Sequence, residues 1–308
     1  MLISYIIFTD RGIFMDEIFA ELENRRKKAS ALIIPGVILF ILGILAAIIF
    51  GSVSPLIIIA VAIILLIIGA VQYKKFASVY KEKVVKGVLG EVFDNLVFEP
   101  KSGISYETVS ATGMMNMGDR FSSNDLITGT YHGVGFMQSD VHIEEESTDS
   151  DGHTSTYTLF RGRWMIFDFN KTFHCDLQII SRRFTAARRK GGIFSKKENK
   201  MPKIELENEE FNKAFTVYAH DTTEAFYILT PHMQEALLNL YRSMKSPIML
   251  MFCGGNLHIA AHTGKDAFEP NLTRKLVPEK ERAFILADTK IITEFVDEMK
   301  LDNDIYKN

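Results

Sequence analysis

Two long apolar runs stand out near the start of the chain. Residues 31–50 and 56–71 contain no charged or hydrogen-bonding side chain. Twenty residues of α-helix span roughly 30 Å, which is about the thickness of the hydrocarbon core of a bilayer. The first run therefore fits a full crossing, and the second reaches that length when Pro55, Gln72 and Tyr73 are included. The pattern predicts two membrane-spanning helices.

The free energy of transfer favours insertion in a membrane over burial in a soluble core. The first run holds fourteen Leu, Ile, Val or Phe residues. At about 0.3–0.6 kcal/mol each, these residues favour the bilayer by at most roughly 4–8 kcal/mol. Both runs lack the ionisable groups that ion paths and proton relays in membranes require. The pattern therefore favours an anchor over a channel or transporter.

The charges beside the apolar runs predict their orientation. Only residues 51–54 separate the first run from Pro55, so the two helices are expected to form a hairpin over residues 31–73, with both long ends on one face. Basic residues flank the hairpin at these ends only, and short basic flanks set orientation by the positive-inside rule. We expect both termini in the cytoplasm. The topology-setting residues are Arg25, Arg26, Lys27, Lys28, Lys74 and Lys75.

The segment before the hairpin, residues 1–30, is predicted to be cytoplasmic. Its first fourteen residues lack a basic leader, and their apolar stretch is too short for a span or a signal peptide. An amphipathic pattern starts at Met15, after which Ile18, Phe19 and Leu22 share a helical stripe. Translation from Met1 and translation from Met15 are both compatible with this pattern.

Beyond the hairpin, residues 74–98 are predicted to form an amphipathic stalk helix. Apolar residues recur there at near-helical spacing, and Pro100 is expected to stop the helix. Gly87 and Gly90 weaken the helix by about 1 kcal/mol each relative to Ala. We interpret the apolar stripe of this helix as core packing.

Residues 99–308 are predicted to form one cytoplasmic α+β domain. Runs rich in β-branched and aromatic residues predict strands at 129–146, 155–170, 175–181, 215–221, 225–230 and 248–262. The polar stretch 147–155 is typical of a hairpin loop. Helical spacing predicts one helix over 231–244, with Pro231 at its start, and a last helix from about Lys280 to Lys300. Because strands and helices do not alternate regularly, the pattern indicates α+β rather than a doubly wound fold.

Three features together resemble a known family. They are the short membrane hairpin, the segment FRGRWMIFDFNKTF at 160–173 and the segment FNKAFTVYAHDTTEAFYILTPHMQEALLNL at 211–240. Across residues 72–270 the chain is similar to bacterial membrane proteins of the family called domain of unknown function 3137. The resemblance implies a bacterial protein, so that the plasma membrane of the hairpin would be the inner membrane. Since the family has no established activity, it carries no functional residue to this chain.

The charges of the chain are unevenly distributed. The full sequence carries a net charge of −3, whereas residues 182–200 hold eight basic residues and one acidic residue. Such a cluster indicates either a polyanion contact or a solvated loop. The overall acidity and the membrane anchor disfavour nucleic acid and favour anionic lipid. The lipid-contact residues of this hypothesis are Arg182, Arg183, Arg188, Arg189, Lys190, Lys196, Lys197 and Lys200.

Candidate metal sites are weak. Residues 147–158 place Asp149, Asp151 and Gly152 as in part of a calcium loop, but Thr158 stands where a bidentate carboxylate is needed. His258 and His262 lie at a spacing that puts both on one face of a strand. Two imidazoles without a third ligand favour ordinary core or surface histidines. We predict no metal and no cofactor.

The sequence contains none of the common catalytic motifs. A GxSxG elbow, a CxxC pair, a GxxxxGK[ST] loop and an HExxH helix are all missing. We therefore expect a non-enzymatic, membrane-anchored binding or scaffold protein with an unidentified protein partner. The alternative is a membrane-tethered enzyme acting on lipid-derived or envelope substrates, since a catalytic site can be assembled from distant residues.

Overall fold

The computed structural model describes residues 2–50, 55–168, 177–184, 201–244 and 246–299. The chain divides into two compact units. Unit 1 comprises Met1–Val88 and Phe268–Ala287, and unit 2 comprises Leu89–Ala267 and Asp288–Asn308. The division differs from the expected one at residue 99, because a stretch from the C-terminal third of the chain belongs to the helical unit.

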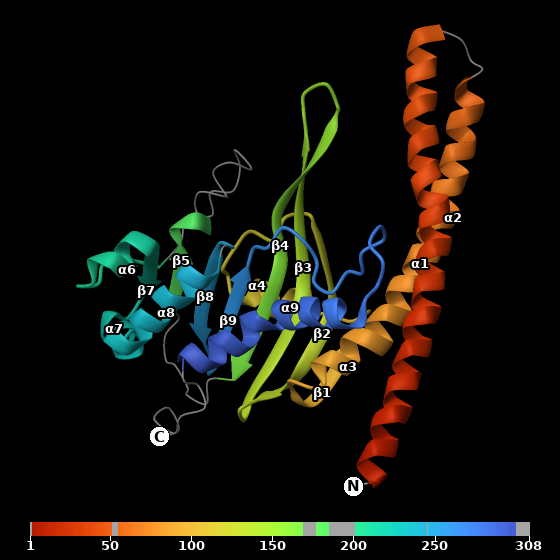
Figure 1. Ribbon diagram of the computed structural model, residues 1–308. Coiled ribbons are helices and arrows are strands. Elements are labelled where there is room, and N and C mark those ends of the chain that lie inside the picture. The colour runs from red at the N-terminus through yellow and green to blue at the C-terminus, as the bar shows by residue number, and fades with distance from the viewer. Residues whose placement is uncertain (1, 51–54, 169–176, 185–200, 245, 300–308) are drawn as a thin grey trace. The chain divides into compact units, whose positions relative to one another are not determined.

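Unit 1 is built on two antiparallel helices, α1 (Leu2–Phe50) and α2 (Pro55–Tyr80) (Figure 1). Glycines let the helices approach closely, since a Cβ on Gly43 would lie 2.6 Å from Cγ1 of Ile59, and one on Gly69 would lie 2.6 Å from Cγ1 of Ile33. The outward surface is apolar, and Ile48 is 74% exposed. Both helices are long and apolar enough to span a membrane.

The helix after the second apolar run is shorter than the predicted stalk. Helix α2 continues as a π-helical turn, η1 (Lys81–Val85), and then as α3 (Lys86–Leu89). The backbone N–H groups of Val92 and Phe93 both donate to the Leu89 carbonyl in a turn that includes Gly90. Residues 94–99 form strand β1, so the prediction of a helix through residue 98 is wrong. Gly90, whose helix propensity is low, directly follows the last helical residue, Leu89.

The C-terminal stretch of unit 1 is tied to the two helices by polar contacts. Arg26 Nη1 donates to the Leu272 carbonyl at 2.7 Å, and the Tyr73 hydroxyl donates to the Pro270 carbonyl at 3.1 Å. These bonds hold an irregular segment against helical surfaces that carry polar side chains.

Unit 2 contains an antiparallel sheet that has nine strands within the described residues. The order is β1-β2-β3-β4-β9-β8-β5-β7-β6. The strands are β1 (Asp94–Glu99), β2 (Arg120–Tyr131), β3 (Val134–Thr148), β4 (Thr154–Asp168), β5 (Leu177–Ser181), β6 (Lys203–Ile204), β7 (Phe215–Ala219), β8 (Ile248–Cys253) and β9 (Asn256–Ala261). Together with the helices, this sheet confirms the α+β prediction.

The longest hairpin of the sheet follows from local turn chemistry. Strands β3 and β4 pair from Phe136–Phe167 to Thr148–Thr154, and they project beyond the neighbouring strands (Figure 1). At the tip, Asp149 Oδ1 accepts the backbone N–H groups of Asp151 and His153. The prediction of a hairpin loop in this stretch is confirmed.

Each face of the sheet is covered by different elements. One face packs in a core around Trp164 and Phe160, which includes Val109 of α4 (Tyr106–Ala111). Against the other face, Phe295 in the second half of α9 (Pro278–Met299) stacks on Phe167 at 4.7 Å. Helices α6 (Glu209–Ala214), α7 (Thr222–Ile228) and α8 (Pro231–Ser243) complete unit 2.

The predicted helices at 231–244 and about 280–300 are confirmed as α8 and α9, with Pro231 in the first turn of α8. The strand predicted over 225–230 is wrong, because most of it belongs to helix α7. The side chain of Asp221 caps that helix by accepting from the N–H groups of Thr223 and Glu224. An N-terminal cap of this kind stabilises a helix by about 1 kcal/mol, which outweighs the weak strand preference of AFYILT.

Candidate functional site

A row of side chains crosses one face of the sheet in unit 2. The strand register pairs Thr128 with Met137, Met137 with Ile166 and Ile166 with His258. Paired residues of antiparallel strands point to the same face, so these four side chains form a line from β2 to β9. Thr128, Met137 and Ile166 are half-buried, whereas His258 is buried.

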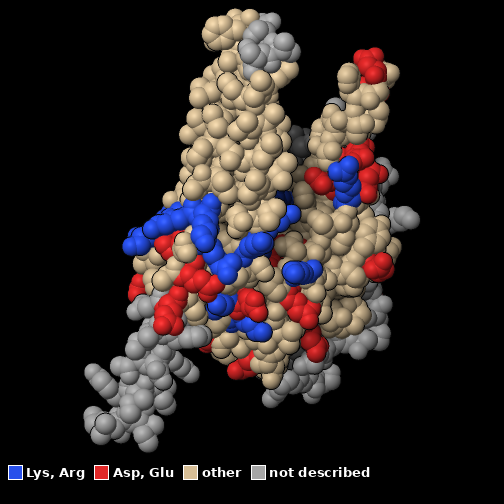
Figure 2. Space-filling view, turned by 90° about the vertical axis from the view of Figure 1, so that its right-hand side faces the viewer, with Lys and Arg blue, Asp and Glu red and all other residues tan. Residues whose placement is uncertain are grey.

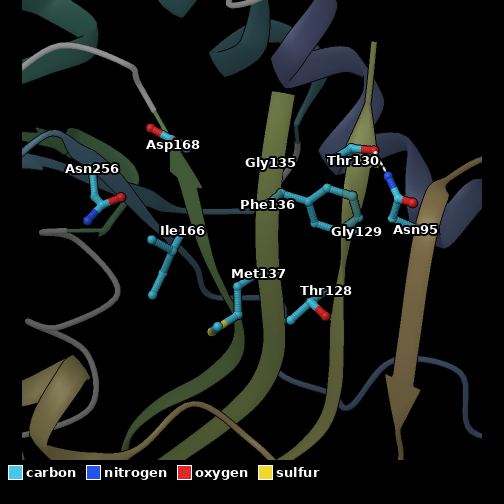
Figure 3. Close-up of a pocket in the computed structure, with 10 residues that line it drawn as sticks. All are labelled: Asn95, Thr128, Gly129, Thr130, Gly135, Phe136, Met137, Ile166, Asp168 and Asn256. Atoms are coloured by element: carbon cyan, nitrogen blue, oxygen red, sulfur yellow. Dashed lines mark hydrogen bonds between the residues drawn. The ribbon is translucent and has the colours of Figure 1, made fainter. Parts of the chain in front are cut away.

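An open hollow of about 410 Å³ lies over the half-buried end of this row (Figure 3). Its wall includes Met137, Ile166 and Thr128, and Gly135 contributes no side chain. The nearest atom that a Cβ on Gly135 would meet is Asp168 Cβ at 3.8 Å, so a small side chain would fit beside the backbone here. Glycine at this position keeps the hollow open.

Polar groups mark the rim of the hollow at the sheet end. Asp168 pairs with Asn256 across β4 and β9, and Thr130 accepts a hydrogen bond from Asn95 Nδ2 at 3.3 Å. Figure 3 shows Asp168 and Asn256 on one side of the hollow and Thr130 with Asn95 on the other. The hollow thus offers an apolar wall beside amide, hydroxyl and carboxylate groups, an arrangement that suits a peptide segment.

The two histidines singled out in the sequence have structural neighbours. Trp164 Nε1 donates to His258 Nδ1 at 3.3 Å, and burial lowers the pKa of His258 to about 4. His262 Nδ1 accepts from the backbone N–H of Arg161 at 3.2 Å, and burial lowers its pKa too. Both rings therefore serve as neutral hydrogen-bond acceptors in the packed sheet.

A charged cluster that sequence reasoning missed lies beneath α9. The Arg163 side chain pairs with the Asp288 carboxylate at 2.7 Å and also donates to the Asp288 carbonyl. Asp140, which faces Arg163 across β3 and β4, is 2% exposed and accepts from the backbone N–H of Ala267. Such burial of three charged side chains is costly unless they are paired.

Burial dominates the ionisation of Asp140. It raises the pKa of this carboxyl to about 7, while the Ala267 N–H and the Arg163 charge act in the opposite direction, and Asp125 and Asp266 raise the pKa further. The sequence carries no clear signal for this cluster, because Asp140 follows the polar residues Gln138 and Ser139 and Arg163 lies close to a second arginine, Arg161. The cluster is closed to solvent, so we assign it a structural role.

The topology-setting residues lie at the base of the hairpin in unit 1. Arg25 pairs with Glu21 at 2.8 Å and Arg26 with Glu23 at 2.7 Å. The lysines are exposed: Lys27 lies 4.0 Å from Glu23, whereas Lys28, Lys74 and Lys75 form no ion pair within the described chain.

The basic stretch 182–200 is described only at its start. Arg182 donates to the Asn212 carbonyl at 2.9 Å. Arg183 donates to the carbonyls of Tyr241 and Met244 at 2.8 and 2.7 Å, and its guanidinium lies 3.9 Å from the centre of the Tyr241 ring. Both arginines thus bind neighbouring backbone. The other predicted lipid-contact residues, Arg188, Arg189, Lys190, Lys196, Lys197 and Lys200, lie outside the described residues.

In the parts of the chain that the structure describes, no three His, Cys, Asp or Glu side chains are arranged to hold a metal ion.

Comparisons with known proteins give one match. No curated protein and no solved structure matches the chain. Residues 158–301, which include most of β4 and all of α9, match a family model. The matched model is that of the family described as Protein of unknown function (DUF3137), and this region of the chain is similar to that family.

Proposed function

We propose that this chain is a bacterial, non-enzymatic protein of the inner membrane that binds a protein partner on the cytoplasmic side. The apolar hairpin would serve as the anchor and the hollow of unit 2 as the binding surface. The observation that carries the proposal is the hollow: an apolar wall and a polar rim lie side by side next to the Trp164 core, on the same face of the sheet.

The surface of the hairpin supports the membrane anchor. Ile49 and Phe50 are 73% exposed and Ile57 is 71% exposed, and such large apolar side chains recur along both helices. An apolar surface of this length is unfavourable in water and matches lipid. Because lysines lie only at the end opposite the turn, the positive-inside rule favours a cytoplasmic location for both termini.

The chemistry of the hollow supports a peptide segment as the bound group. Met137 and Ile166 offer contact area to an apolar side chain, while Asn256 and Thr130 can hydrogen-bond peptide N–H and C=O groups. An open hollow of this kind admits a segment of a larger protein.

A photo-crosslinking experiment in native membranes tests the binding surface. A photoreactive amino acid replaces Thr128 in the hollow or, as the matched control, the exposed Thr223 on α7. We expect a discrete crosslinked protein from Thr128 that is lost when Asn256, an exposed residue on the rim of the hollow, is replaced by Lys. The same product from both positions, or one that Asn256→Lys leaves unchanged, would argue against the hollow. An unchanged melting temperature would show that Asn256→Lys still folds.

The basic stretch 182–200 remains a proposed contact for anionic lipid. Arg182 and Arg183 bind neighbouring backbone, so the lipid contact rests on the residues from Arg188 onwards. Ser in place of Arg188, Arg189, Lys190, Lys196 and Lys197 should weaken salt-sensitive binding of the full chain to anionic vesicles. Unchanged binding would leave the stretch as a solvated connector.

A further inference from the structure

The register of the hairpin in unit 1 can be read from its glycines. The side chains nearest to Gly36, Gly43 and Gly69 include Leu66, Ile59 and Ile33, respectively. In each of these contacts the two residue numbers add to 102. Because α1 and α2 are antiparallel helices with the same rise per residue, this sum holds along the pair. It places Lys28 level with Lys74, and Lys27 level with Lys75.

These four lysines form a belt directly outside the apolar part of the hairpin. The apolar runs begin at Ala31 and end at Val71, so the belt lies within about one helical turn of both ends. Figure 2 shows the tan surface of the hairpin giving way to Lys and Arg at its base. With the hydrocarbon core matched to the apolar runs, the ammonium groups reach the level of lipid headgroups.

The carboxylates near the belt are engaged by other cations. Glu21 binds Arg25 at 2.8 Å and Lys83 at 3.0 Å, and Glu23 binds Arg26 at 2.7 Å. Glu269, which the Tyr73 hydroxyl contacts, pairs with Lys81 at 2.5 Å.

Outside its apolar runs, the part of unit 1 whose side chains are described carries thirteen Lys and Arg against seven Asp and Glu. The Lys27 side chain is 70% exposed although it lies 4.0 Å from Glu23. The belt therefore presents uncompensated positive charge to its surroundings.

We infer that Lys27, Lys28, Lys74 and Lys75 form a binding site for the phosphate groups of anionic phospholipids at the cytoplasmic surface of the membrane. The inference rests on the proposed membrane anchor and names the lipid class that the anchor selects. Charge complementarity carries it, since four ammonium groups at one level match phosphates that lie in one plane. Each lysine near an anionic surface contributes about a fivefold preference, so two of the four in contact with phosphates already provide more than tenfold selectivity.

Lipid retention by the full-length chain tests this site. The protein is purified in micelles that contain equal amounts of phosphatidylcholine and phosphatidylglycerol, and the lipids that remain bound are counted by native mass spectrometry. We expect phosphatidylglycerol to be retained about tenfold or more over phosphatidylcholine. Replacing the four belt lysines by Gln should lower this preference several-fold, whereas replacing them by Arg should preserve it.

A matched control changes four exposed lysines elsewhere, Lys101, Lys213, Lys280 and Lys290, to Gln and should leave the preference intact. Equal retention of both lipids by the natural protein, or an unchanged preference in the belt variant, would overturn the lipid site alone. Flotation with pure phosphatidylcholine vesicles separates this failure from a failure of the proposed anchor. A chain that does not float would overturn the anchor together with the lipid site.

Discussion

Replacement of Asp140 by Asn should change how the stability of the sheet unit depends on pH. Asp140 is buried beside Arg163 and Asp288, and burial raises the pKa of its carboxyl from 3.8 to about 7. A raised carboxyl pKa means that the folded state binds the proton more tightly than the unfolded state does. Proton binding by Asp140 therefore stabilises the folded sheet unit at low pH, and this stabilisation is lost as the pH rises towards 7.

The size of the effect follows from the two pKa values. The carboxyl of Asp140 has a pKa of 3.8 in the unfolded state and about 7 in the folded state. Proton linkage with these two values lowers the free energy of unfolding of the natural protein by about 2.5 kcal/mol between pH 5 and pH 8. The amide of the Asp140→Asn variant does not titrate, so the variant avoids this loss. For a unit of this size, the melting temperature of the variant relative to the natural protein should rise by roughly 5–10 °C over that range.

Fluorescence of Trp164, the single tryptophan of the chain and a fully buried residue of the sheet unit, reports this unfolding directly. Melting of the full chain in detergent is followed at several pH values for the natural protein, for Asp140→Asn and for the exposed control Asp151→Asn. The readout is the slope of the difference against pH, because an amide at position 140 also introduces a constant offset. A flat difference, or a variant that loses stability faster with rising pH, would refute the reasoning.

Three glycines give further predictions. In a chain without its native cysteines, cysteines that replace Gly36 and Leu65 should form a disulfide readily, because their Cβ atoms would lie 3.4 Å apart. Adding Gly43→Leu should lower the yield of this disulfide, because the larger side chain separates the two helices. Equal yields with and without Gly43→Leu would contradict the close packing. Gly162→Ala should lower the melting temperature by several degrees or prevent folding, because its Cβ would lie 2.1 Å from the Ala261 carbonyl oxygen. A Gly162→Ala protein that melts at the natural temperature would contradict this geometry.

The elements that the sequence predicted correctly are those determined by local chemistry. The apolar runs, the polar turn between β3 and β4 and the periodic helix that starts at Pro231 each carry their signal within a few neighbouring residues. The errors arose where the residues next to a segment outweighed the secondary-structure preference of the segment itself. Asp221 capped a helix where aromatic residues favoured a strand, and a turn after Leu89 followed a helix that apolar spacing would have continued.

The sites depend on register and could not be predicted in this way. The hollow requires Thr128, Met137 and Ile166 to stand in line on three strands, and a bulge in β2 between Asn124 and Ile127 helps to set that alignment. The charged cluster joins Arg163 to Asp288, which is 125 residues away in the chain. Such contacts follow from tertiary packing, which single-sequence periodicity does not encode.

The central claim is that the hairpin crosses the membrane and leaves the sheet unit in the cytoplasm. Labelling of single cysteines in intact cells with a membrane-impermeant maleimide tests it most directly, in a chain whose Cys175 and Cys253 are replaced by Ser. A cysteine replacing Ser52, between the apolar runs, should react from outside. One replacing the exposed Asp151 should react only after the membrane is opened. External labelling of the Asp151 position, with protection of the Ser52 position, would contradict the claim.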